Sequence, residues 1–184
     1  LFRSGLNILI EGNIPNGAGL SSSASLEVLT GTILKETFQL PISKLDIIKL
    51  SQKAENQFVG MNCGIMDQFI IGMGKKDHAI ALDTGTLEYT YAPVQLKQAS
   101  IVIMNTNKQR GLTDSKYNER RAECEHALSQ LQTVVKIKNL CDLKETEFEK
   151  VQHIITSPVE RKRARHAVLE NIRVKKAIAE IGRA

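Results

Sequence analysis

GNIPNGAGLSSSAS, residues 12–25, runs through a Gly-Ala-Gly-Leu turn into four serines within five positions. Gly17 and Gly19 lack a Cβ and can adopt positive φ, so main-chain N–H groups there can point at one spot. The serines at 21–23 stand where a helix begins, and its unpaired N–H donors and positive dipole end face the same spot. The stretch therefore predicts an anion cradle. No lysine follows the second glycine, so a bound nucleotide would rely on backbone amides and hydroxyls.

A bare Gly-x-Gly before a helix is more often an ordinary turn whose serines cap the helix. The whole stretch, however, resembles the Pro-x-Gly-Ala-Gly-Leu-Ser-Ser-Ser-Ala-Ser phosphate loop of the galactokinases, in the superfamily shared with homoserine, mevalonate and phosphomevalonate kinases. The resemblance implies that the phosphates of ATP are held by Gly17, Ala18, Gly19, Leu20, Ser21, Ser22 and Ser23.

The bulk composition is that of a globular protein. The chain has 184 residues, of which 42% are apolar, and this is enough to bury a core in one domain or two small ones. No apolar run is long enough to span a bilayer, and the N-terminus lacks the order of a signal peptide. Cys63, Cys124 and Cys141 are widely spaced and read as reduced thiols. We therefore expect a cytoplasmic protein without a membrane partner.

The charge distribution argues against nucleic acid as a partner. The formal net charge is +5 and the isoelectric point is near 9.1, but much of the positive charge lies between residues 161 and 176. The five phenylalanines and three tyrosines are scattered rather than interleaved with these basic residues, so no platform for stacking bases is expected. The pattern predicts a solvated helix face and no nucleic-acid partner.

Three regions have the patterns of strands. Residues 5–11, GLNILIE, alternate enough to predict a half-buried strand that feeds the phosphate loop. Residues 78–82 and 87–92 predict two strands around the turn DTGT. Pro93 and the polar residues after it mark a domain boundary, and Ser100 to Met104 is an apolar run that predicts a central strand.

Helical spacing predicts two helices in the first half of the chain. The first follows the phosphate loop and extends to about Phe38. Ser43 with Asp46 three residues later is a variant of the capping box and begins the second helix. The face of the second helix that we expect to be buried carries Ile47, Leu50, Ala54 and Phe58.

Two further helices are expected in the second half. One begins near Thr113 or Asp114. The other is long and basic and begins near Pro158. The side chains of this basic helix that we expect to face the interior are Ala164, Val168 and Ile172.

Two acidic residues are singled out by the resemblance alone. From spacing, Glu55 reads as a solvated side chain and Asp67 as a helix cap. The segment AEN around Glu55, however, resembles the galactokinase segment whose glutamate holds Mg²⁺ with a serine of the phosphate loop, which implies metal roles for Ser23 and Glu55. The segment CGIMDQ resembles the family's catalytic segment, which implies that Asp67 is the base and that Gly64 and Asp67 contact the substrate.

Tyr117 has two interpretations. It lies at helical spacing with apolar residues and could be a core aromatic. The segments NTN at 105–107 and SKYNERRAEC at 115–124 also resemble galactokinases, and the resemblance implies that Tyr117 contacts the sugar. A phenol suits a hexose because it offers an apolar ring and a polar tip.

The resemblance covers residues 3 to about 174, and on it the chain is identified as a member of the galactokinases. It implies an α+β, two-domain GHMP kinase fold that is partial here. Residues 1–92 would be the remnant of an S5-like nucleotide domain, and residues 93–184 the start of a ferredoxin-like domain. The implied activity, in galactose metabolism, is the ATP- and Mg²⁺-dependent phosphorylation of α-D-galactose at its C1 hydroxyl.

Two family segments lie outside these 184 residues. They are the N-terminal Arg-Val-Asn-Leu-Ile-Gly-Glu-His-Thr-Asp-Tyr segment, which supplies the transition-state arginine and most sugar contacts, and a C-terminal Gly-rich segment. We therefore expect a fragment that is nearly inactive alone and whose exposed edges favour self-association. Two alternatives stay open: a kinase for an N-acetylated amino sugar, and a non-catalytic sensor of ATP and galactose. The intact Ser23-Ala24 pair favours the enzyme over the sensor.

Overall fold

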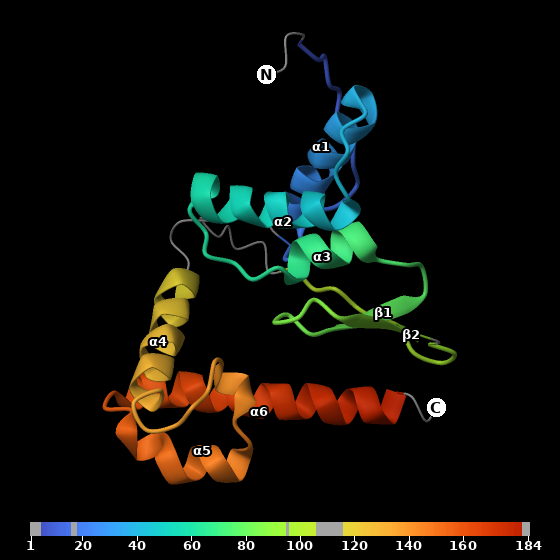
Figure 1. Ribbon diagram of the computed structural model, residues 1–184. Coiled ribbons are helices and arrows are strands. Elements are labelled where there is room, and N and C mark those ends of the chain that lie inside the picture. Colours follow the sequence, from blue (N-terminus) through green and yellow to red (C-terminus); the bar gives the residue numbers. More distant parts are fainter. Residues whose placement is uncertain (1–4, 16–17, 95, 106–115, 182–184) are drawn as a thin grey trace.

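The computed structural model of the chain describes residues 5–15, 18–94, 96–105 and 116–181. It combines helices with one small sheet (Figure 1). In chain order the elements are α1 (Ser22–Phe38), α2 (Lys44–Ala54), the π-helical turn η1 (Glu55–Val59), α3 (Met66–Met73), β1 (His78–Leu82), β2 (Tyr89–Pro93), α4 (Lys116–Leu131), the 3-10 turn η2 (Leu140–Asp142), α5 (Glu145–Val151), the 3-10 turn η3 (Gln152–Ile154) and α6 (Pro158–Ile181).

The elements form two groups, each with its own core (Figure 1). The N-terminal lobe, residues 18–94, packs α1, α2 and α3 together above the β1–β2 hairpin. Its core is centred on Ile48, Ile65 and Phe69. The C-terminal lobe, residues 116–181, packs α4, α5 and α6, and its larger core includes Leu131, Phe148 and Val168.

Two glycines let the helices of the N-terminal lobe approach closely. A Cβ added at Gly31 of α1 would lie 2.6 Å from Ile47 Cγ2, and one added at Gly72 of α3 would lie 2.6 Å from Ile48 Cδ1. Ile47 of α2 therefore packs against Gly31, and its neighbour Ile48 packs against Gly72. A larger side chain at either glycine position would take the space that the isoleucine occupies.

The predicted capping box at the start of α2 is confirmed. The Asp46 N–H donates to Ser43 Oγ at 3.1 Å, and the Ser43 N–H donates to Asp46 Oδ2 at 2.8 Å. Ser43 Oγ also donates to Asp46 Oδ2 at 2.6 Å, and this bond, followed by that from the Ser43 N–H, holds the pKa of Asp46 below its ordinary value. Two of the unpaired N–H groups at this helix end are thereby satisfied, which fixes where α2 begins.

The predicted buried face of α2 is correct at Ile47 and wrong at its other three positions. The face that packs inward carries Ile47, Ile48, Ser51 and, one turn on, Glu55. By contrast Leu50 is 55% exposed and Phe58 is 92% exposed, and Ala54 is exposed as well. The inward face ends in polar residues because it reaches the candidate site. The prediction looked for a stripe of apolar residues and therefore selected the wrong side of the helix.

The hairpin was predicted correctly, except that its second strand begins at Tyr89 and not at residue 87. β1 and β2 are antiparallel, with His78 opposite Pro93 and Leu82 opposite Tyr89. In the turn, Asp83 Oδ1 accepts from the Gly85 N–H at 2.8 Å. The Tyr89 ring packs edge-on against Phe69, with centroids 5.2 Å apart, which joins the hairpin to α3.

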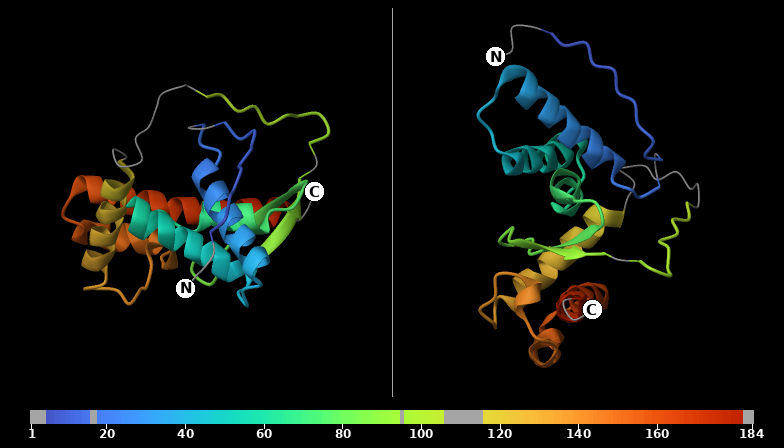
Figure 2. Two further views of the ribbon diagram at one scale, coloured as in Figure 1. Left: turned by 90° about the horizontal axis from the view of Figure 1, so that it is seen from above. Right: turned by 90° about the vertical axis from the view of Figure 1, so that its right-hand side faces the viewer.

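Two predicted strands are not strands in this structure. Residues 5–11 and Ser100 to Met104 have no strand geometry, and Leu9 and Met104 are 95% and 86% exposed. The hairpin is the only sheet among the described residues, so neither segment has a hydrogen-bonding neighbour there. A strand needs such a neighbour, whereas an apolar run supplies only the propensity for one. Figure 2 shows both segments running along the periphery.

The C-terminal lobe follows the predicted helical spacing. Ala164 and Val168 are 0% and 1% exposed, and Ile172 packs against the same core. Arg163 Nε lies 2.8 Å from Glu123 Oε2, so part of the basic face of α6 is paired with α4. The predicted start of α4 near Thr113 or Asp114 lies outside the described residues. Across the described chain, no helix is long and apolar enough to cross a membrane.

Candidate functional site

The predicted phosphate loop leads directly into α1. Gly19 and Ser21 both have left-handed backbones, with φ of 73° and 55°, and α1 begins at Ser22. Its hydrogen bonding starts with the Ser25 N–H donating to Ser21 O at 2.9 Å. The first turn carries no acidic side chain of its own. Of the predicted loop residues, Gly17 lies outside the described part of the chain.

The serines of this loop contact both acidic residues singled out in the sequence. Ser21 Oγ donates to Asp67 Oδ1 at 2.6 Å, and Ser23 Oγ donates to Glu55 Oε2, also at 2.6 Å. Asp67 lies in the first turn of α3, whose N-cap is Ile65, so Asp67 does not cap that helix. The fold brings residues from the loop, α3 and η1 into one polar cluster.

The spacing of Glu55 had suggested a solvated side chain. In the structure Glu55 is buried, with 3% of its surface exposed. One of its oxygens, Oε1, has no hydrogen-bond partner among the described residues. A buried carboxylate oxygen is costly unless a donor or a cation compensates it. The orphaned oxygen is therefore an observation that fits a bound cation.

Two residues of the cluster were missed in the sequence, Glu27 and Gln68. Gln68 is 1% exposed, and its Nε2 donates to Glu27 Oε2 at 3.1 Å. Burial, and then the neighbouring Glu55 carboxylate, raise the pKa of Glu27 from 4.5 to about 7. A signal for Glu27 was available, because it follows Ser23 by four residues and so shares its face of α1.

The raised pKa of Glu27 predicts a pH-dependent stability. Because native Glu27 binds its proton more tightly than unfolded Glu27, its contribution is fully present below about pH 4.5 and is lost as the pH rises to about 7. Glu27→Gln removes this loss and still accepts the Gln68 hydrogen bond. We expect the variant to gain roughly 1 kcal/mol at pH 8 over the parent, a value reduced because the side chain is only partly buried.

Urea unfolding at pH 5 and pH 8, without divalent cations, measures this effect. Glu36→Gln, on an exposed part of the same helix, is the matched control and should not change the difference between the two pH values. An equal gain for both variants at pH 8 would contradict the assignment to Glu27.

The two remaining predicted site residues meet at the loop before α3. The Gly64 N–H donates to Tyr117 Oη at 3.4 Å. Tyr117 is 44% exposed, so it is not a core aromatic. Its phenol instead lies against the segment that leads into Asp67, although it comes from α4 in the other lobe.

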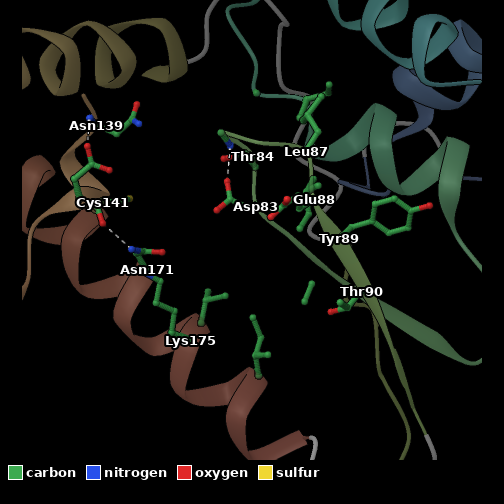
Figure 3. A pocket seen from close by; sticks show the side chains of 18 of the residues that line it. Asp83, Thr84, Leu87, Glu88, Tyr89, Thr90, Asn139, Cys141, Asn171 and Lys175 are labelled. Carbon is green, nitrogen blue, oxygen red and sulfur yellow. Dashed lines mark hydrogen bonds between the residues drawn. The ribbon is translucent and has the colours of Figure 1, made fainter. Parts of the chain in front are cut away.

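A separate cavity of about 1210 Å³ lies between the hairpin and α6 (Figure 3). It is lined from one side by Asp83 and Tyr89 and from the other by Asn171 and Lys175. Of the predicted site residues it includes Gly64 alone. Polar groups around it are already used within the fold: Asn171 Nδ2 donates to Cys141 O at 3.0 Å, and Asp83 is occupied by its own turn. The chemistry-bearing cluster therefore lies elsewhere.

Within the described ranges, no three His, Cys, Asp or Glu side chains gather as a metal site. A cation at Glu55 would accordingly take few protein ligands. This is the usual case for Mg²⁺, which keeps waters and shares nucleotide phosphates rather than filling a protein cage.

Comparisons with known proteins show what the chain is similar to. Residues 1–75 match the family model described as GHMP kinases N terminal domain. The chain is 59% identical over 179 residues to a galactokinase of Clostridium acetobutylicum, covering 97% of this chain and 46% of that protein. It is 60% identical over 176 residues to a galactokinase of Fusobacterium nucleatum, covering 95% of this chain and 45% of that protein.

A solved structure gives the same result. The crystal structure of Lactococcus lactis galactokinase complexed with galactose matches with a TM-score of 0.88 and 49% identity, over 92% of this chain and 44% of that one. The chain thus spans somewhat less than half the length of the relatives that it matches. Its residues 1–75 match the N-terminal domain of GHMP kinases, and the chain resembles the galactokinases over nearly all of its own length.

Proposed function

We propose that the protein transfers the γ-phosphoryl group of ATP to the C1 hydroxyl of α-D-galactose. The observation that carries this proposal is the pairing of the phosphate-loop serines with Asp67 and Glu55, each at 2.6 Å. A nucleotide cradle, a candidate base and a candidate cation ligand thereby share one cluster. Support also comes from the relatives, which are named galactokinases and include one solved with galactose.

The domain division is part of the proposal. Residues 1–92 would belong to an S5-like nucleotide domain and residues 93–184 to the start of a ferredoxin-like domain. The separate cores on either side of residue 93 support this division, since a domain is expected to bury its own apolar residues.

In this mechanism Asp67 accepts or orients the proton of the attacking hydroxyl. Ser21 Oγ holds one oxygen of the Asp67 carboxylate and leaves the other oxygen for the sugar. Tyr117 and Gly64 would contact the sugar beside it, and their mutual hydrogen bond keeps them adjacent. Phosphoryl transfer depends mostly on positioning and charge stabilisation, so holding these groups fixed is the main task of the fold.

The nucleotide phosphates would lie over residues 17–23, where main-chain N–H groups and serine hydroxyls are the donors. Ser23 and Glu55 would hold Mg²⁺, and the orphaned Glu55 Oε1 supports that role. When bound, Mg²⁺ supplies neutralisation of the charge on the phosphates.

Galactose-dependent formation of ADP tests the function. We expect it in the longest natural chain that contains these residues, and little or none in the 184-residue chain alone. Turnover of an N-acetylated amino sugar in preference to galactose would contradict the substrate. Binding of ATP and galactose without turnover would contradict the enzyme and favour a sensor.

Replacing Glu55 by glutamine tests the cation site. The change removes the negative charge while keeping the shape of a side chain that is 3% exposed. We expect the Mg²⁺ concentration for half-maximal ATP binding to rise about tenfold or more, because a neutral amide is a weaker ligand for a hard cation. Isothermal titration of ATP at a series of Mg²⁺ concentrations measures this, with Glu36→Gln as the control. An unchanged Mg²⁺ dependence would remove Glu55 from the site.

A further inference from the structure

Asn118, in the first turn of α4, holds the loop formed by residues 60–64. Its Nδ2 donates to Gly60 O at 3.0 Å, and its Oδ1 accepts from the Asn62 N–H at 3.0 Å. One amide therefore satisfies a carbonyl and an N–H of the same loop. Figure 1 shows the start of α4 beside this loop, where the two lobes meet.

The loop joins the two acidic groups of the candidate site. It starts at Gly60, whose φ of 85° ends the π-helical turn that contains Glu55, and it leads into α3, which carries Asp67. The Met61 N–H donates back to Glu55 O at 3.1 Å. The start of the loop is therefore fixed to the end of the π-helical turn.

The loop also carries the contact to Tyr117. Tyr117 and Asn118 are neighbours in sequence, and they contact the loop at Gly64 and at Gly60 and Asn62 respectively. The Tyr117 contact is long, at 3.4 Å, and Tyr117 is 44% exposed. By itself it fixes the phenol weakly, whereas the two 3.0 Å bonds of Asn118 fix the backbone next to it.

We propose that Asn118 is a positioning residue for the sugar: it keeps Tyr117 and Gly64 in register with Asp67. An asparagine amide is suited to this task because it presents a donor and an acceptor side by side. The inference rests on the proposed function, since it assumes that the sugar binds between Tyr117, Gly64 and Asp67. It predicts an effect on the affinity for galactose, because the groups positioned contact the sugar both before and during the reaction.

Two variants of the longest natural chain test the proposal. Asn118→Ala removes both hydrogen bonds, and Asn118→Asp keeps the acceptor but sets an oxygen against Gly60 O. We expect Asn118→Ala to raise the KM for galactose about fivefold, with kcat and the KM for ATP nearly unchanged. Asn118→Asp should raise it at least as much. Asn171→Ala is the matched control, because Asn171 also donates to a backbone carbonyl, within the C-terminal lobe.

Amide hydrogen exchange in the loop provides a readout that does not depend on turnover. The Asn62 N–H should exchange faster in Asn118→Ala than in the parent and in Asn171→Ala, because Asn118 Oδ1 is its acceptor. The proposal would be overturned if Asn118→Ala had the same KM for galactose as the parent, or if its KM for ATP rose as much as its KM for galactose. Either outcome would leave the proposed function in place. A parent that does not phosphorylate galactose would overturn both.

Discussion

Replacing Asp67 by asparagine should lower galactose-dependent phosphoryl transfer by about 10²- to 10⁴-fold and leave ATP binding in place. The side chain keeps its shape, and Ser21 Oγ, which donates to Asp67 Oδ1 at 2.6 Å, can donate equally to the asparagine oxygen. What is lost is the second carboxylate oxygen as an acceptor for the proton of the sugar hydroxyl. Steady-state turnover of galactose and calorimetric titration of ATP, both in the longest natural chain, separate the two effects.

Asp77→Asn is the matched control for this change. Asp77 is exposed, and its backbone is left-handed with φ of 57°, a conformation that asparagine tolerates as well as aspartate does. Its substitution should leave turnover within about twofold of the parent, as for a surface change away from the site. If Asp67→Asn also kept most of its turnover, Asp67 would be neither a base nor an orienting group for the hydroxyl.

Replacing Phe148 by alanine should lower the free energy of unfolding of the C-terminal lobe by about 3–5 kcal/mol. Phe148 is 1% exposed and packs in the same core as Leu131 and Val168, so truncation leaves a cavity that fixed helices cannot fill. The N-terminal lobe buries a different set of residues. We therefore expect ATP binding to the 184-residue chain to be retained while helical signal from the other lobe is lost at lower urea concentration.

Phe58→Ala is the control for the loss of an aromatic ring. Phe58 is 92% exposed, and its removal should change the free energy of unfolding by no more than about 0.5 kcal/mol. Circular dichroism and nucleotide binding, followed through the same urea series, report on the two lobes. Simultaneous loss of both signals in Phe148→Ala would contradict the division near residue 93.

Local patterns were sufficient where the structure depends on neighbours in sequence. The capping box at Ser43 and Asp46, the extent of α1 and the inward positions Ala164 and Val168 were all predicted from spacing. The strands at 5–11 and 100–104 were not correctly predicted, because a strand is defined by a neighbour that no local pattern specifies.

The candidate site shows the same limit. Resemblance selected Asp67 and paired Glu55 with Ser23, which lies 32 residues away. No pattern in the sequence indicated that Ser21 would contact Asp67 across 46 residues. Hydrophobic spacing even assigned the wrong face to α2, since the face toward the site ends in Ser51 and Glu55. Core positions are predicted from the spacing of apolar residues, so polar residues that are buried at a functional site are missed by this method.

The two glycines that face Ile47 and Ile48 restrict how related sequences can diverge. A Cβ at Gly31 or at Gly72 would come within 2.6 Å of its isoleucine, so neither position can gain volume unless its partner loses some. An evolutionary record of this constraint should exist as covariation: relatives with a larger residue at position 31 should carry a smaller one at 47, and likewise for 72 and 48. Residue sizes should covary within each pair of positions, 31 with 47 and 72 with 48, and not between the two pairs.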